Sequence, residues 1–226
     1  SSFDNMSPIR LYTESMMSLT RPMGMGDISI AEELHDWREA FTVEGAKQLC
    51  RSSTAALTFA SLGCGACIGT MGTLRTRKWM PKWASEVVPC KRAMWESLTN
   101  SPRYGCVTTL TDAMLPWVAM IAITMPCIDF SSSGNKKGGA GATGWLWLAA
   151  VQLAITVSPL VIFSEMADNA VRVNGGTEYR QVLAALQVAY VVHSRIVRVW
   201  DYGGGSHRKR LILCCFRKDL TATSLF

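Results

Sequence analysis

Four polar residues near the end of an apolar segment have side chains that could bind a redox cofactor. They are His193, Arg195, Asp201 and Tyr202, and His193 is the only one of the three histidines that lies within an apolar run. A histidine can ligate haem iron. The pattern indicates a haem or quinone site, and the alternative is that these side chains only anchor a helix at a membrane interface.

The order of these residues resembles the membrane anchors of succinate dehydrogenase, in which a histidine at a helix end is followed by Asp-Tyr and serves haem and quinone. Here seven residues separate His193 from Asp201, fewer than in that family, and no further apolar span follows. A shift of about one helical turn directs a side chain to another face. The roles of that family are therefore not carried over, and a redox anchor stays the alternative function.

Other motifs lack the context that their chemistry requires. Residues 139–144 have the G-x-G-x-x-G spacing of a dinucleotide loop, but the polar turn 131–137 precedes them instead of a strand. Cys64 and Cys67 form a C-x-x-C pair without further ligands at a suitable spacing, so we expect no metal. The three histidines are scattered and accompany no nucleophile motif, so we predict no catalytic residues and no enzymatic activity for the isolated chain.

Asp112 is an acid beside an apolar segment, which could make it a proton relay or an ion ligand. Its place behind Thr108, Thr109 and Thr111 favours a simpler role as a helix cap. A third hypothesis, a small transporter or channel, would use Asp112 together with Gln152.

Long uncharged stretches would have to position any such site. They span residues 52–74, 113–128 and 138–164, and a helix of roughly 20 residues crosses a bilayer. We predict an all-α integral membrane protein with transmembrane helices at about 53–74, 112–130 and 144–164. A fourth helix at 179–200 is either interfacial or a short span.

The remaining segments complete this predicted organisation. Residues 1–51 would form an extramembrane N-terminal arm with an amphipathic helix, and residues 201–226 a basic C-terminal tail. The first span carries a stripe of small residues that predicts helix packing: Ser61, Gly65, Gly69 and Gly72.

The charge pattern favours a membrane partner. The net charge is +6, and the chain is 49% hydrophobic and 18% charged. We expect anionic phospholipid to bind the cations of the C-terminal region, which are Arg195, Arg198, Arg208, Lys209 and Arg210. A basic face with interleaved aromatics is not evident, which argues against nucleic acid.

These features together predict a non-catalytic accessory subunit of a large organellar membrane complex. The mitochondrial inner membrane is the expected location, within the respiratory chain of electron transport or the ATP synthase, with other membrane subunits as partners. A thylakoid photosystem subunit is the alternative. No cofactor is predicted with this role apart from bound phospholipid.

Overall fold

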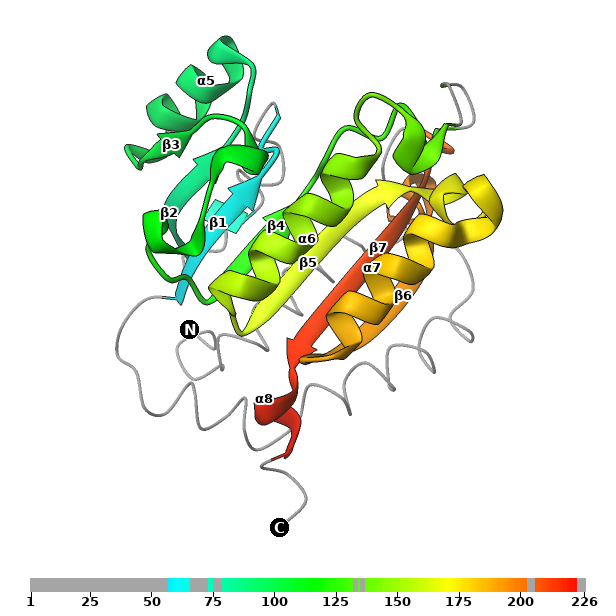
Figure 1. Cartoon of the computed structure of the whole chain (residues 1–226). Coiled ribbons are helices and arrows are strands. Elements are labelled where there is room, and N and C mark those ends of the chain that lie inside the picture. Colours follow the sequence, from blue (N-terminus) through cyan, green and yellow to red (C-terminus); the bar gives the residue numbers. More distant parts are fainter. Residues whose placement is uncertain are drawn as a thin grey trace.

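The computed structural model describes residues 57–65, 73–74, 79–131, 134, 137–202 and 206–222. The predicted arm and amphipathic helix of residues 1–51 lie outside these ranges, as do Gly69 and Gly72. The described residues form a seven-stranded sheet in the order β3-β2-β1-β4-β5-β7-β6, accompanied by helices (Figure 1). The fold is therefore mixed α/β.

The strands and helices alternate along most of the chain. The strands are β1 (Leu57–Leu62), β2 (Trp79–Ser85), β3 (Arg103–Tyr104), β4 (Met120–Ile123), β5 (Val161–Ala167), β6 (Tyr190–Arg198) and β7 (Lys209–Arg217). The α-helices are α5 (Pro89–Thr99), α6 (Trp145–Val157), α7 (Thr177–Gln187) and α8 (Lys218–Ala222). Short 3-10 helices span Val107–Thr109, Asp112–Met114, Gly138–Ala140, Asp168–Val171, Val173–Gly176 and Val199–Tyr202.

The strand directions determine where a site can form. β1 pairs in parallel with both β2 and β4, and β4 pairs in parallel with β5. β7 is antiparallel to both β5 and β6. The chain runs from β1 outward to β2 and β3, then returns to β4 on the other side. Open parallel sheets bind ligands at such a switch point, outside the carboxyl ends of the strands.

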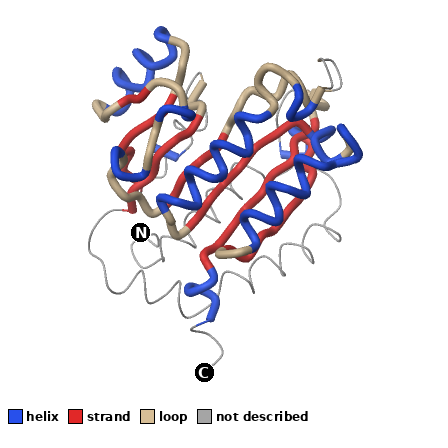
Figure 2. Tube along the Cα trace, in the orientation of Figure 1, coloured by secondary structure: helices blue, strands red, loops and turns tan. Residues whose placement is uncertain are grey.

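The two faces of the sheet carry separate hydrophobic clusters. α6 and α7 lie beside each other on one face, where Trp147 packs edge-on against Phe130 (Figures 1 and 2). Neighbouring strand residues point to opposite faces, so Phe59 joins a second cluster that includes Trp95 of α5. The central strands are thus covered on both faces.

The prediction of an all-α membrane protein is wrong. Each predicted helix is divided: 53–74 contains β1, 112–130 contains β4, 144–164 contains α6 and part of β5, and 179–200 contains most of α7 and then β6. Strand β7 lies within the segment predicted to be a basic tail. In the described ranges no helix has the length and apolar character needed to span a bilayer, and α6 has 13 residues.

The physical reason is that the inner strands of a parallel sheet are buried on both faces and therefore read as continuous apolar runs. Such runs cannot be distinguished from a buried helix by their periodicity. The breakers within them mark the boundaries: Gly63 follows β1, Pro116 and Pro126 flank β4, and Pro159 precedes β5. The chain turns at these positions instead of continuing as a helix.

Candidate active site at the carboxyl edge of the sheet

A tight turn directly after β4 holds Cys127. The carbonyl of Cys127 accepts hydrogen bonds from the backbone N–H groups of Phe130 (3.0 Å) and Ser131 (2.8 Å). Phe130 is fully buried against Trp147, which anchors the turn to the core. Cys127 itself is half-buried, and its neighbour Ile128 is 53% exposed. The turn therefore presents the Cys127 thiol at the carboxyl edge of the sheet, where solvent can reach it.

The fully buried carboxylate of Asp129 connects this turn to the start of α6. Its Oδ2 accepts hydrogen bonds from the backbone N–H and the hydroxyl of Thr143, both at 2.8 Å. The carbonyl of Asp129 also accepts from the N–H of Gly138 (3.0 Å). A Cβ at Gly141 would lie 2.1 Å from the Asp129 carboxyl carbon, so only glycine fits there. The Gly-rich segment 139–144 thus packs closely against the Cys127 turn.

An acid reaches the same edge from the neighbouring strand. Glu165 follows Ser164, which pairs in register with Ile123 at the end of β4. Its carboxylate forms an ion pair with Arg210 of β7, and both side chains are largely buried. Burial raises the pKa of Glu165, and the positive charge of Arg208 opposes this rise.

The Cys127 thiol interacts with the same two charged groups. The pKa of the Cys127 thiol is raised above its usual value, because burial and the nearby Glu165 raise it by more than the charge of Arg208 and a hydrogen bond from Arg208 lower it. A nucleophile, an acid held toward its protonated form and a guanidinium therefore meet at one point. This is the combination that covalent catalysis with acid assistance requires.

A glycine loop and a second acid lie beside this point, at the ends of β1 and β2. Gly63 has φ +70°, and the Thr124 hydroxyl donates to its carbonyl (2.6 Å), so the loop abuts the residues after β4. Glu86 is 8% exposed and accepts hydrogen bonds from the N–H groups of Gly65 (2.9 Å) and Val88 (3.0 Å). Glycine loops followed by an acid on the next strand bind nucleosides in open α/β sheets.

The residues predicted to bind haem or quinone do not gather at this site. His193 lies on β6 opposite Cys214, with its ring against Phe216, and burial lowers its pKa. Arg195 is also on β6, Asp201 pairs with Arg198 (3.0 Å), and the Tyr202 backbone ends a 3-10 helix. In the described part of the chain, no group of three or more His, Cys, Asp or Glu could hold a metal ion. The haem or quinone prediction has no support from this arrangement.

The predicted lipid-binding cations are divided between two strands and several partners. Arg195 and Arg198 lie on β6, Arg208 directly precedes β7, and Lys209 and Arg210 are its first residues. Of these, Arg208 contacts Cys127 and Arg210 pairs with Glu165. They therefore belong partly to the candidate active site.

The other residues that were singled out in the sequence lie on different elements of the fold. Ser61 is buried in β1 between two strands, and Gly65 is in the loop that follows. Asp112 and Gln152 are exposed on different helices. The sequence reasoning missed Cys127 and Glu165. The available signal was that each lies at the end of an apolar run, Cys127 behind Pro126 and Glu165 directly after the third predicted span.

Residues 57–225 match the family of C-5 cytosine-specific DNA methylases. The Type II methyltransferase M.HhaI of Haemophilus parahaemolyticus is 27% identical over 117 residues, which are 51% of this chain and 36% of that protein. M1.ScrFI of Lactococcus lactis subsp. cremoris is 23% identical over 158 residues, covering 69% of this chain and 41% of the relative. The chain thus spans less than half the length of these curated relatives.

Solved structures share the fold. A DNA modification methyltransferase encoded within an E. coli prophage superposes with a TM-score of 0.62 at 15% identity, covering 73% of this chain and 48% of the other. The Dnmt2 methyltransferase of S. pombe superposes with a TM-score of 0.55 at 17% identity, covering 72% and 50%. The seven-stranded sheet described above is therefore a methyltransferase fold.

These matches overturn the functional predictions made from composition. The predicted accessory subunit of a respiratory-chain, ATP-synthase or photosystem complex is wrong, as is its location in the mitochondrial inner membrane or thylakoid. The expectations of a non-enzyme with membrane subunits and phospholipid as partners, and without nucleic acid, are wrong as well. The apolar runs that suggested a membrane contain strands of this sheet and the helix α6 that covers it. The chain belongs to the C-5 cytosine-specific DNA methylase family.

Proposed function

We propose that this chain carries the catalytic centre of a DNA methyltransferase that acts on carbon 5 of cytosine, with Cys127 as its nucleophile. The observation that carries this proposal is the meeting of Cys127, Glu165 and Arg208 at the carboxyl edge of the sheet. Carbon 5 of a pyrimidine is a poor nucleophile until another group adds to carbon 6. A positioned thiolate and a positioned acid are the groups that this activation needs.

The first step joins Cys127 to the base. The thiolate of Cys127 adds to carbon 6 of cytosine, a sulfur–carbon bond forms, and the displaced electron pair becomes available at carbon 5. Glu165, whose pKa is raised by burial, donates a proton to ring nitrogen 3 and so neutralises the charge that would otherwise develop on the ring. The thiol first gives up its proton to solvent, and the positive charge of Arg208 favours the thiolate against the raised pKa.

The later steps restore the enzyme. After carbon 5 has acquired a methyl group, a water molecule takes the proton of carbon 5. The electron pair left at carbon 5 re-forms the ring double bond as the bond between sulfur and carbon 6 breaks, and the Cys127 thiolate is released. Glu165 recovers the proton from ring nitrogen 3. The target base must leave the duplex to reach this edge, as in other enzymes that act on a single base.

S-adenosylmethionine, the usual methyl donor of methyltransferases, fits the loop after β1. Gly63 and Gly65 have φ of +70° and +52°, so the loop turns with bare backbone at the switch point. The Glu86 carboxylate accepts two backbone hydrogen bonds and retains acceptor capacity for ribose hydroxyls. When bound, this donor would supply an electrophilic methyl group on a sulfonium.

Duplex DNA that contains 5-fluorocytosine tests the proposal directly. Fluorine cannot leave carbon 5 as a proton does, so a protein that attacks carbon 6 and transfers a methyl group stays bound to the DNA. We expect an adduct that survives denaturing electrophoresis, and we expect Cys127→Ser to abolish it. Cys90→Ser, at an exposed cysteine of α5, is the matched control and should retain the adduct. An adduct that persists in Cys127→Ser would refute the assignment.

A further inference from the structure

An exposed pair of stacked rings lies in the connection between β6 and β7. The indole of Trp200 and the imidazole of His207 have ring centroids 4.9 Å apart and an interplanar angle of 19°. Trp200 is 54% exposed, and His207 is exposed as well. The pair therefore presents aromatic surface to solvent.

The stacked pair adjoins the candidate active site along the chain. His207 directly precedes Arg208, which hydrogen-bonds to Cys127, and Arg210 beyond it pairs with Glu165. β6 runs parallel to β5 across the sheet, because both are antiparallel to β7. The end of β6 and the start of β7 thus lie at the same edge of the sheet as Glu165.

Positive charge surrounds the stacked pair. Arg198, Arg208 and Lys209 are exposed on its two flanks. The acid in this connection, Asp201, is paired with Arg198 at 3.0 Å. Lys209 and Arg208 therefore leave a net positive surface beside the two rings. Stacked aromatics flanked by cations are the elements with which proteins hold single-stranded nucleic acid.

We propose that Trp200 and His207 form a stacking platform for an unstacked base of the DNA substrate, with Lys209 holding an adjacent phosphate. The inference rests on the proposed function and specifies how the substrate is held. Extrusion of the target cytosine opens the duplex and exposes base faces close to Cys127. A flat aromatic surface beside that point stabilises the opened strand through stacking, whatever the base sequence.

Measurement of DNA binding and methyl transfer in four variants tests the platform. Trp200→Leu should raise both the Kd and the KM for DNA about tenfold and leave kcat at saturating DNA nearly unchanged. Trp200→Phe should retain most of the affinity because phenylalanine can still stack on a base. Lys209→Ala should reduce the slope of the logarithm of the DNA-binding constant against the logarithm of the salt concentration by about one, the contribution of a single phosphate contact. Trp117→Ala removes a tryptophan of similar exposure, 53%, at the opposite edge, and should leave the Kd unchanged.

The outcomes separate the platform from the catalytic proposal. Equal affinity of Trp200→Leu and Trp200→Phe would overturn stacking, even if both variants bind less tightly than the parent. An unchanged Kd in Trp200→Leu would overturn the platform while normal adduct formation with 5-fluorocytosine DNA left the proposed function intact. Failure of the unsubstituted protein to form that adduct would instead refute the proposed function itself.

Discussion

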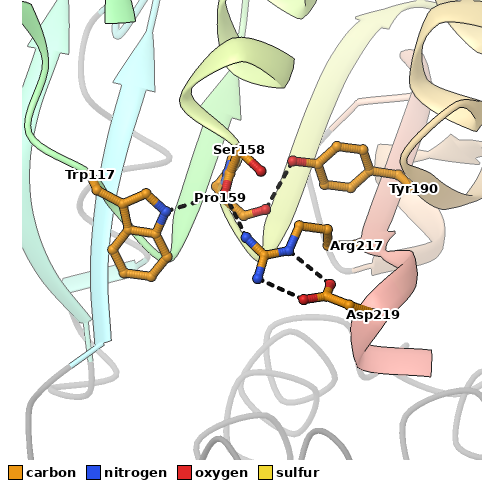
Figure 3. Close-up of polar contacts among 6 residues, drawn as sticks. All are labelled: Trp117, Ser158, Pro159, Tyr190, Arg217 and Asp219. Carbon is orange, nitrogen blue, oxygen red and sulfur yellow. Dashed lines mark hydrogen bonds and ion pairs between the residues drawn. The ribbon is translucent and has the colours of Figure 1, made fainter. Parts of the chain in front are cut away.

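The two edges of the sheet use similar polar residues for different purposes. At the amino edge, Arg217 donates two hydrogen bonds to Asp219 (2.8 and 2.9 Å) and one to the carbonyl of Ser158 (2.9 Å) (Figure 3). Trp117 also donates to Ser158 (3.2 Å), and Tyr190 donates to the carbonyl of Pro159 (2.9 Å). At the carboxyl edge, Glu165 contacts Arg210, but burial still disfavours its charged form.

The two edges differ in how they shift the pKa of an acid, Asp219 at the amino edge and Glu165 at the carboxyl edge. Its hydrogen bonds with Arg217 hold the pKa of Asp219 below its usual value, so this carboxylate stays ionised and links β7 to α8. Burial instead raises the pKa of Glu165. A charged group that is fully paired stabilises the fold, whereas one held toward its neutral form is available for proton transfer. The amino edge therefore joins strands, and the carboxyl edge carries chemistry.

The largest expected effect comes from Cys127→Ser. A serine hydroxyl is a far weaker nucleophile than a thiolate, so methyl transfer to DNA should fall by at least about 10³-fold. The half-buried sulfur contributes little to packing, so the melting temperature should remain close to that of the parent. Radiolabelled methyl incorporation and a thermal melt measure the two. Retention of a tenth of the activity would place the nucleophile elsewhere.

Glu165→Gln tests the acid of the carboxyl edge. The amide cannot donate a proton to the base, so kcat should fall by about 10²–10⁴-fold while DNA binding is retained. Single-turnover methylation with saturating DNA measures this loss. A variant with full kcat would show that Glu165 only pairs with Arg210.

Asp129→Ala probes the connection between the Cys127 turn and α6. The substitution leaves the two Thr143 donors without their buried acceptor, which should cost about 3 kcal/mol of unfolding free energy and also lower kcat. Asp129→Asn retains an acceptor oxygen and should lose less of both. Denaturant unfolding and methylation rates measured on both variants check the order. Wild-type stability in the alanine variant would contradict the anchoring role.

Tyr190→Phe addresses the amino edge. The fully buried hydroxyl donates to Pro159, and its loss should cost about 1 kcal/mol without altering methylation, because it lies at the end of the sheet remote from Cys127. Chemical denaturation with a parallel activity assay distinguishes the two edges. A large fall in kcat with this variant would contradict the separation of a stabilising amino edge from a catalytic carboxyl edge.

The smallest expected effect is the dependence of stability on pH, in which Asp219 and Glu165 should act in opposite directions. The lowered pKa of Asp219 gives stability that is present above about pH 4 and is lost as the pH falls, and exposure limits it to about 0.5 kcal/mol. The raised pKa of Glu165 acts oppositely, since stability is lost as the pH rises through its folded pKa. Unfolding free energies over a pH series should flatten on the acid side in Asp219→Asn and at higher pH in Glu165→Gln. The same slope change in both variants would refute the contrast.

Part of the fold could be read from the residues. The apolar composition of the runs indicated that these segments are removed from water. The environment of those runs was assigned wrongly, because burial by other helices and strands produces the same apolar pattern as burial in lipid. Pro126 and Pro159 within the runs carried the information that they turn.

The amino-acid sequence by itself determined which segments are removed from water and where the chain is punctuated by glycine and proline. Only the tertiary structure decided that Cys127, Glu165 and Arg208 form one site. Cys127 follows β4, Glu165 lies within β5 and Arg208 precedes β7, and nothing in their spacing along the chain relates them. They meet because β4 and β5 are parallel neighbours whose carboxyl ends share an edge, and because β7 runs antiparallel and begins at that edge.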